Sequence, residues 1–184
     1  SKLLVEMMLK WMGRIYGINY VIFRYFNVCG SDESGEIGDS KKPSQLLVQN
    51  AVRGAMGIEP FFLTCGKVDT PDGTPIRDQI DVSDLATAHL RAYEYLTEGG
   101  QSDVFNLGNG TGYSVLEIVK KVEEIFHTEI PRKQGEARKG EYAKIYADIT
   151  KAKEKLGWKP IKTLEESVLN LKKWYTKHPN GYDF

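Results

Sequence analysis

The chain has 184 residues, 41% of them hydrophobic, which is typical of one globular domain that can bury its own core. Lysine plus arginine and aspartate plus glutamate number 25 each, so the zero net charge excludes a general attraction to nucleic acid or to an anionic membrane surface. The two cysteines and three histidines are scattered and form neither a disulfide framework nor a metal-ligand pattern. Two cysteines this far apart fit a reducing compartment, so we expect a cytoplasmic protein without a metal site. No apolar run reaches about 18 residues, so no membrane span is expected.

The first predicted element is an amphipathic helix over residues 1–16, which Gly17 ends. Its apolar stripe consists of Leu3, Leu4, Met7, Met8, Trp11, Met12 and Ile15. The sequence contains no strand or capping loop ahead of this helix. We therefore expect residues 1–184 to be part of a larger protein.

A buried strand is predicted next, because residues 20–26 form a continuous apolar and β-branched run. Such a run is typical of a strand that is covered on both faces of a parallel sheet. Asn27 follows at its carboxyl end, where ligands bind in open α/β sheets, so its amide is a candidate ligand-binding group. The alternative is that Asn27 only turns the chain into a long loop over residues 28–43.

Two helices with polar caps are predicted in the middle of the chain. Ser44 caps one that runs through Met56, and Ser83 or Asp84 caps the other. Residues 61–65, which lie between them, form a candidate strand.

Arg77 lies in a stretch, residues 76–82, whose alternation of apolar and polar residues predicts a half-buried strand. The stretch follows a turn rich in glycine and proline, so Arg77 is expected at a strand end beside a loop. Its paired N–H donors match phosphate oxygens, which makes it a candidate ligand of a diphosphate. The alternative is a surface ion pair of Arg77 with Asp78 or Asp81.

A glycine-rich loop over residues 108–112 follows a short predicted strand at residues 103–107. A loop of this kind before a helix can cradle a phosphate with its backbone amides. The glycines can equally serve a tight turn from strand to helix, and that interpretation is the more common outcome.

The remaining elements are predicted from helix caps. The caps are Ser114 with Glu117 for a helix through Phe126, Asp148 for a short helix that ends at Gly157, and Thr163 with Glu166 for a helix through Lys177. Residues 131–142 form a basic loop, which is either a second anion site or a solvated surface. Strands alternate with helices, so the fold class is α/β with partly parallel pairing.

Several short motifs occur in a recognisable order along nearly the whole chain. They are Ser1-Lys2-Leu3, Arg24-Tyr25-Phe26-Asn27, residues 72–84 from Asp72-Gly73-Thr74, Asn106-Leu107-Gly108, Tyr113-Ser114-Val115, residues 148–158 and His178-Pro179-Asn180-Gly181-Tyr182. With these motifs the chain resembles the C-terminal half of the UDP-glucose 4-epimerase family, within the extended short-chain dehydrogenases/reductases. The resemblance implies the last strands of a Rossmann sheet plus a small mixed α/β substrate-binding domain. Residues 1–30 would be the remnant of the Rossmann domain, and residues 31–184 mainly the UDP-sugar-binding domain with returning strands and helices.

The resemblance implies an isomerase that keeps NAD bound and interconverts UDP-glucose and UDP-galactose by removing a hydride from the sugar C4 and returning it to the other face. Lys2 matches the lysine of the family's Tyr-x-x-x-Lys motif and would be catalytic. The motif's tyrosine falls ahead of Ser1, and the dinucleotide fingerprint is absent from this sequence. The chain alone is therefore expected to be inactive without the N-terminal nucleotide-binding half.

The resemblance also implies site residues. Those for NAD are Lys2, Tyr25 and Phe26, and those for the UDP-sugar are Asn27, Gln45, Leu46, Leu63, Cys65, Arg77, Arg138 and Glu141. Glu141 replaces the usual aspartate and Cys65 an aromatic residue, while Gln79 and Asp81 depart from the family pattern without an evident reason. Ile145 stands near a position whose bulk limits the sugar pocket, so N-acetylated sugars are expected to be restricted but not excluded.

Two other functions remain open from the sequence. A related nucleotide-sugar dehydratase or decarboxylase would use the same hydride chemistry, although the closing His-Pro-Asn-Gly-Tyr favours the epimerase. A non-catalytic UDP-binding module would retain Asn27, Arg77 and Arg138 without any reaction. The family also implies a homodimer, with the helix over residues 1–16 contributing to a bundle between subunits.

Overall fold

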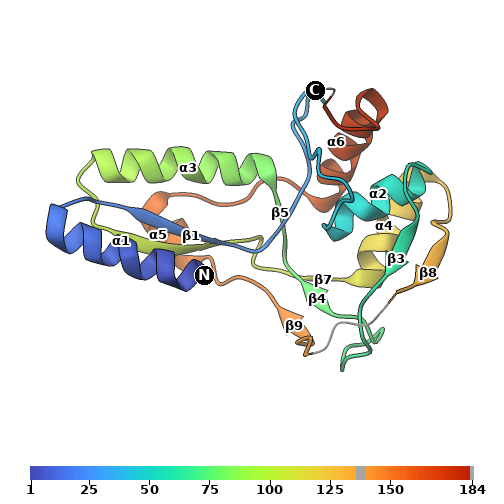
Figure 1. Cartoon of the computed structure of the whole chain (residues 1–184), viewed down its shortest axis with the longest axis horizontal. Helices are drawn as coiled ribbons and strands as arrows, with labels where there is room; N and C mark the ends of the chain where they lie inside the picture. The colour runs from blue at the N-terminus through green and yellow to red at the C-terminus, as the bar shows by residue number, and fades with distance from the viewer. Residues whose placement is uncertain (136–139, 183–184) are drawn as a thin grey trace.

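The computed structural model describes residues 1–135 and 140–182 and shows an elongated molecule with two groups of elements (Figure 1). The first group contains α1 (Lys2–Tyr16), β1 (Val21–Tyr25), α3 (Val82–Thr97), β6 (Asp103–Leu107) and α5 (Thr150–Leu156). The second contains α2 (Leu47–Ala55), β3 (Phe61–Leu63), α4 (Val115–Phe126), β8 (Arg132–Gln134) and α6 (Leu164–Lys177). Short strands lie between the groups: β2 (Asn27–Cys29), β4 (Ile76–Arg77), β5 (Gln79–Asp81), β7 (Tyr113–Ser114) and β9 (Lys144–Ile145).

Each group has its own hydrophobic core. In the first, α3 and α5 pack on the parallel pair β1 and β6, and the buried residues include Ile80, Phe105, Leu107 and Trp158. In the second, α2, α4 and α6 pack together around a larger core that includes Phe61, Ile118, Leu171 and Trp174. Helices α2, α3, α4, α5 and α6 therefore contribute buried side chains to the cores, whereas α1 contributes none.

The parallel strand predicted at residues 20–26 is confirmed, but the prediction that it is buried on both faces is wrong. Val21–Tyr25 pair in register with Asp103–Leu107, and Ile22 is the buried residue of β1. Within the described residues β1 has a neighbour on one edge, β6. Arg24 and Tyr25 are exposed, and Arg24 donates two hydrogen bonds to Glu6 of α1.

Two predicted loops contain strands. β2 begins at Asn27, extends into the predicted loop over residues 28–43 and pairs in parallel with β5. β8 lies in the predicted basic loop over residues 131–142 and pairs in parallel with β3. Both strands were missed because each has three residues, too few for a pattern of alternation, and each depends on a partner distant in the sequence.

Two predicted caps are wrong. Ser44 donates its hydroxyl to Asp39 at 3.3 Å, and α2 begins three residues later with Leu46 at the cap position. Neither Ser83 nor Asp84 caps α3. The cap is Asp81, whose carboxylate accepts a hydrogen bond from the Ser83 amide at 2.8 Å.

The other predicted helix ends are mostly confirmed. The capping boxes of Ser114 with Glu117 and of Thr163 with Glu166 are both formed. Asp148 accepts a hydrogen bond from the first amide of α5, at Thr150, although Ile149 occupies the cap position itself. No helix in the described part of the chain is both long and apolar enough to cross a membrane.

The strand predicted over residues 76–82 is divided into β4 and β5 at Asp78. β4 pairs with β7 on one side and with β9 on the other, whereas β5 pairs with β2. The Asp78 carboxylate is 1% exposed and accepts hydrogen bonds from the amides of Asn109, Gly110 and Ala147 at 2.7, 2.9 and 3.0 Å. These bonds hold the chain at the point where it passes from one sheet to the next.

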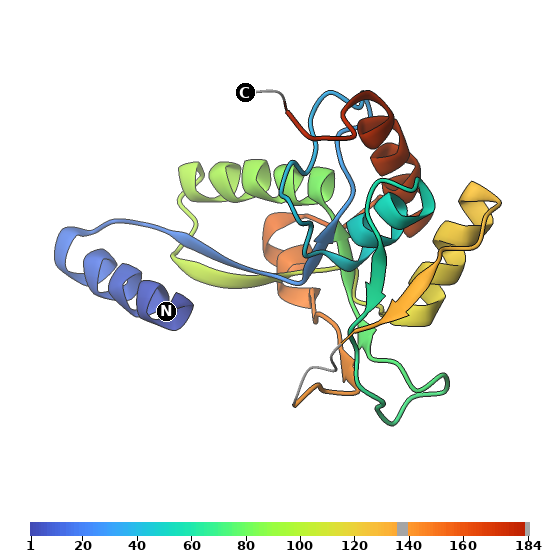
Figure 2. The same ribbon diagram turned by 45° about the vertical axis from the view of Figure 1, so that its right-hand side comes forward.

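Helix α1 stands apart from the second group (Figure 2). The side chains of its apolar stripe are exposed. None of its residues is buried, and Leu4, Met8 and Trp11 are each about three-fifths exposed, at 62%, 62% and 59%. Contiguous apolar patches of this kind mark surfaces that bind another protein surface. The exposure of this stripe agrees with the expectation from the sequence.

We expect the chain to self-associate through this stripe. Replacing Trp11 by Gln should weaken association by about tenfold, because a large aromatic side chain at the centre of an interface carries much of its energy. Sedimentation over a range of concentrations measures the change. Ile161→Gln, at an isolated exposed residue, is the matched control, and a clean monomer at high concentration would contradict the prediction.

Candidate functional site

A small cavity of about 90 Å³ lies where β2, β3 and β4 approach the segment ahead of β9. Five of the residues predicted to bind a UDP-sugar line it: Asn27, Leu63, Cys65, Arg77 and Glu141. They are separated by up to 114 positions in the sequence, from 27 to 141. The fold therefore brings together residues that no local pattern connects.

Asn27 and Arg77 come together because of the break at Asp78. Asn27 lies just beyond the carboxyl end of β1 and begins β2, where it pairs with Gln79 of β5. The backbone N–H of Asn27 donates a hydrogen bond to the Asp78 carbonyl oxygen at 3.1 Å. This places Asn27 next to the residue that follows Arg77.

The Arg77 guanidinium is anchored by backbone carbonyls. Its Nη1 donates to the carbonyl oxygens of Ile76 and Tyr142 at 2.9 and 2.8 Å. Its Nη2 lies 3.8 Å from Oε1 of Glu141, and the two side chains are 17% and 16% exposed. The site is thus a partly desolvated cation with one carboxylate nearby.

The predicted alternative of an ion pair with Asp78 or Asp81 is wrong. Both aspartates are buried at 1% exposure. Asp78 accepts from three backbone amides, and Asp81 accepts from the Ser83 amide and from the Ser167 hydroxyl at 2.6 Å. Their carboxylates are used to hold the backbone, which explains the otherwise puzzling Asp81 but leaves Gln79 without a structural explanation.

Glu141 also reaches the loop after β3. Its Oε2 accepts a hydrogen bond from the Gly66 amide at 3.1 Å, next to the half-buried Cys65. One carboxylate therefore connects the Arg77 end of β4 with the loop that follows β3.

The other residues predicted for the UDP-sugar lie elsewhere. Gln45 is exposed, accepts a hydrogen bond from Lys41 Nζ at 2.8 Å, and lines a neighbouring depression that shares Phe62 and Thr64 with the cavity. Leu46 faces a separate cavity against α3. Arg138 falls outside the described residues.

The three residues predicted for NAD are on the first group of elements. Lys2 is exposed at the start of α1, and Phe26 donates its amide to the Leu107 carbonyl at 3.0 Å. The Tyr25 hydroxyl lies 2.8 Å from Nε2 of His89, whose Nδ1 lies 2.7 Å from the Leu85 carbonyl. Because a carbonyl can only accept, Nδ1 carries a proton, and in the neutral ring Tyr25 donates to Nε2.

Sequence reasoning missed His89, since one histidine on a helix gives no sign of a tyrosine 64 positions away. Although Tyr25 is exposed, partial desolvation by its neighbours raises its pKa above the usual value, which keeps the phenol protonated.

The glycine-rich loop is used as a tight turn. A Cβ at Gly108 would lie 2.5 Å from Asp78 Oδ2, so only glycine allows this approach. The amides of Asn109 and Gly110, which could have met a phosphate, donate to the Asp78 carboxylate. The Asp78 carboxylate therefore takes the backbone amides that the sequence analysis considered for a bound phosphate.

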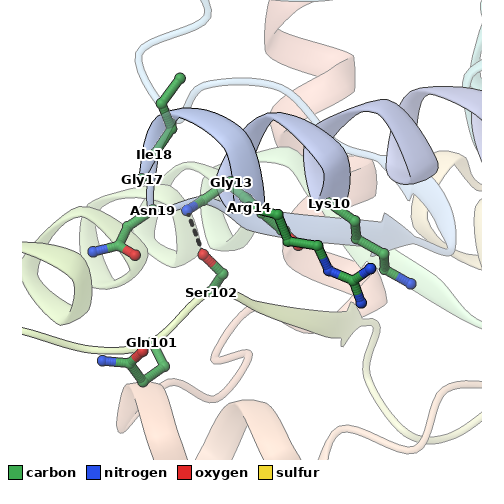
Figure 3. A pocket seen from close by; sticks show the side chains of 9 residues that line it. Lys10, Gly13, Arg14, Gly17, Ile18, Asn19, Gln101 and Ser102 are labelled. Atoms are coloured by element: carbon green, nitrogen blue, oxygen red, sulfur yellow. Dashed lines mark hydrogen bonds between the residues drawn. The ribbon is translucent and has the colours of Figure 1, made fainter.

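A second pocket, shown in Figure 3, lies at the C-terminal end of α1. Lys10 and Arg14 extend along one side, and Gln101 and Ser102 lie opposite. The dashed line marks the hydrogen bond from the Tyr20 amide to the Ser102 hydroxyl at 3.1 Å. None of the predicted site residues lines this pocket.

A sequence model of the NAD dependent epimerase/dehydratase family matches residues 1–108, more than half of the chain. The chain belongs to this family. A UDP-glucose 4-epimerase of Streptococcus mutans is 38% identical over 185 residues, which cover the whole of this chain and 56% of that protein. A UDP-glucose 4-epimerase of Halalkalibacterium halodurans is 39% identical over 184 residues, covering 99% of this chain and 55% of that protein.

Solved structures agree with this family assignment. A crystal structure of a UDP-glucose 4-epimerase superimposes with a TM-score of 0.93 at 42% identity, covering 100% of this chain and 56% of that one. The enzyme of Bifidobacterium longum, in complex with NAD+ and UDP, gives 0.90 at 36% identity, covering 98% and 55%. The resemblance and the α/β fold of the extended short-chain dehydrogenases/reductases are confirmed. The chain spans about half the length of the curated relatives it matches.

We expect Asp78 to be essential for the geometry of the cavity. Asp78→Asn should destabilise the fold by about 2–4 kcal/mol, because an amide offers one acceptor oxygen to three N–H groups and turns its own NH2 toward a donor. Denaturant unfolding measures the loss. Asp69→Asn, at an exposed position, is the matched control, and equal stability of the two variants would contradict this role.

Proposed function

We propose that this chain supplies the UDP-sugar half of the site of an NAD-dependent UDP-glucose/UDP-galactose 4-epimerase. The observation that carries the proposal is Arg77, anchored at Nη1 and facing a cavity shared with Asn27 and Glu141. Family membership and the relative that was solved with NAD+ and UDP support it.

The roles follow from the chemistry of each side chain. The Nε and Nη2 edge of Arg77 pairs with oxygens of the diphosphate, since a guanidinium fork matches phosphate in two parallel hydrogen bonds. The Asn27 amide donates to the same group. Leu63 and Cys65 border the uracil, and Gln45, Leu46, Arg138 and Glu141 complete the enclosure of the nucleotide.

NAD would supply the hydride chemistry at the sugar C4. This chain contributes Lys2, whose ammonium favours the ionised form of a neighbouring tyrosine base, together with Tyr25 and Phe26 beside the nicotinamide. The tyrosine and the dinucleotide fingerprint would come from a nucleotide-binding part outside residues 1–184. The 55–56% coverage of the relatives supports such a part.

We propose the same division for the domains. Residues 1–30 belong to the Rossmann domain, and residues 31–184 form mainly the UDP-sugar-binding domain with returning elements. The parallel pairing of β1 with β6 supports the return of later strands to the first domain. The exposed stripe of α1 supports a homodimer of the complete protein.

Ile145 is proposed to limit the sugar pocket. It lies in β9 in register with Arg77 and is 38% exposed. A branched side chain at the position paired with Arg77, the residue proposed to bind the diphosphate, would restrict N-acetylated sugars without excluding them. Equal turnover of UDP-glucose and its N-acetylated counterpart by the complete enzyme would contradict this.

We expect the chain to bind UDP more tightly than uridine. Arg77→Lys keeps the charge but removes the fork, and should weaken UDP binding by at least about tenfold while leaving uridine binding unchanged. Calorimetry measures both affinities. Arg91→Lys, on the exposed face of α3, is the matched control. Equal affinity of the wild type for UDP and uridine would rule out a diphosphate site.

Catalysis is expected to require the nucleotide-binding part. The purified chain alone should contain no NAD and show no epimerase activity, whereas its complex with that part should retain NAD and interconvert UDP-glucose and UDP-galactose. Cofactor content and sugar analysis measure this outcome. UDP binding without activity in the complex would favour a non-catalytic binding module.

A further inference from the structure

The carboxyl end of β1 is held by a different helix on each face. Phe23 and Tyr25 alternate with Arg24 along the strand, so their side chains lie on the face opposite to that of Arg24. Arg24 donates to Glu6 of α1 at 2.9 and 2.7 Å, whereas the Tyr25 hydroxyl lies 2.8 Å from Nε2 of His89 in α3. The pair of Tyr25 and His89 therefore belongs to the α3 face of β1.

The imidazole ring of His89 is fixed by two further contacts. Its Nδ1 donates to the Leu85 carbonyl oxygen, one turn earlier in α3, at 2.7 Å. Phe23 packs against it edge to face, with ring centroids 5.0 Å apart and ring planes at 71°. Because Nδ1 carries the proton of the neutral ring, Nε2 presents a lone pair to the Tyr25 hydroxyl.

The phenol of Tyr25 depends on His89 for its position. Tyr25 is the last residue of β1 and is 48% exposed, so little packing holds its side chain. Its ring centroid is 6.3 Å from that of Phe23, and in the described part of the chain the hydrogen-bond partner of its hydroxyl is His89. Loss of this bond would leave the phenol free to change its side-chain rotamer toward solvent.

Tyr25 is two residues ahead of Asn27, which lines the cavity with Arg77. The exposed ring of Tyr25, with its hydroxyl tied to α3, offers a flat apolar face on which an aromatic group such as nicotinamide can pack. His89 does not line the cavity. Any effect of His89 on the reaction would therefore pass through Tyr25.

We propose that His89 is a positioning residue of the epimerase site: it accepts a hydrogen bond from the Tyr25 hydroxyl and thereby fixes the phenol ring beside the nicotinamide. The proposal rests on the function proposed above, in which Tyr25 lies next to that ring. Hydride transfer requires close alignment of the two carbon atoms involved, so a loose ring beside the nicotinamide slows the transfer. Binding of the UDP-sugar is unaffected, because neither Tyr25 nor His89 lines the cavity that contains Arg77.

The first test examines the hydrogen bond in the chain itself by long-range 1H–15N NMR, which distinguishes protonated from unprotonated ring nitrogens. At a pH about two units above the ordinary histidine pKa, we expect the proton of His89 on Nδ1. Tyr25→Phe should shift the Nε2 resonance and leave the proton on Nδ1. Tyr16→Phe, at an exposed tyrosine that ends α1, is the matched control and should shift neither nitrogen. A wild-type His89 with its proton on Nε2 overturns the proposal.

The second test measures kinetics in the complex of the chain with its nucleotide-binding part. His89→Leu and Tyr25→Phe should each lower kcat by about tenfold and change the KM for UDP-galactose by less than about twofold. The double variant should be no slower than the slower single variant, because both substitutions remove the same hydrogen bond. His89→Gln, whose amide oxygen can accept from the Tyr25 hydroxyl, should recover most of kcat, and Tyr16→Phe should leave it unchanged.

An unchanged kcat in His89→Leu, or losses that add in the double variant, overturns the positioning role. A general structural role of His89 would lower the affinity of the chain for UDP together with kcat, and calorimetry with UDP that shows such a loss also overturns the proposal. A wild-type complex that retains NAD but has no epimerase activity overturns the proposed function, and with it the positioning role. In that case the NMR measurement still decides whether the hydrogen bond between Tyr25 and His89 exists.

Discussion

The buried carboxylate of Asp78 is the constraint on which the rest of the structure depends. It accepts three backbone amides from two segments that are remote in sequence, the turn at residues 109–110 and Ala147. A buried carboxylate is stable only when its oxygens are satisfied in this way. Because the bonds fix the chain between β4 and β5, they also fix the direction of Arg77 and the position of Asn27 beside it.

Two further aspartates join the two hydrophobic cores. Asp81 caps α3 and accepts the Ser167 hydroxyl of α6, and Asp84 accepts the amides of Ile161 and Lys162 at 3.1 and 3.0 Å. Burial raises the pKa of Asp84 above its usual value, and the two amides oppose that shift. The aspartates of residues 78–84 thus hold the break between β4 and β5, the start of α3 and the segment that leads into α6.

The residues of the candidate site were identified by two different kinds of sequence evidence. The resemblance of the motifs assigned Asn27, Leu63, Cys65, Arg77 and Glu141 to one ligand, and they line one cavity. Composition and periodicity alone suggested Asn27 and Arg77, because each lies at a strand end, and left an ion pair with Asp78 or Asp81 open. Gln45 and Leu46 are adjacent in sequence but face different pockets, since the start of α2 turns them apart. No pattern in the sequence could show that separation.

The sequence by itself determined the helices and most of their ends, because capping boxes at Ser114 and Thr163 and the turn glycines Gly17 and Gly157 act within a few residues of the chain. Tertiary structure decided where the strand at residues 76–82 breaks and which carboxylate approaches Arg77. These outcomes depend on contacts between distant segments, whose energies come from burial and hydrogen bonds that no local spacing encodes.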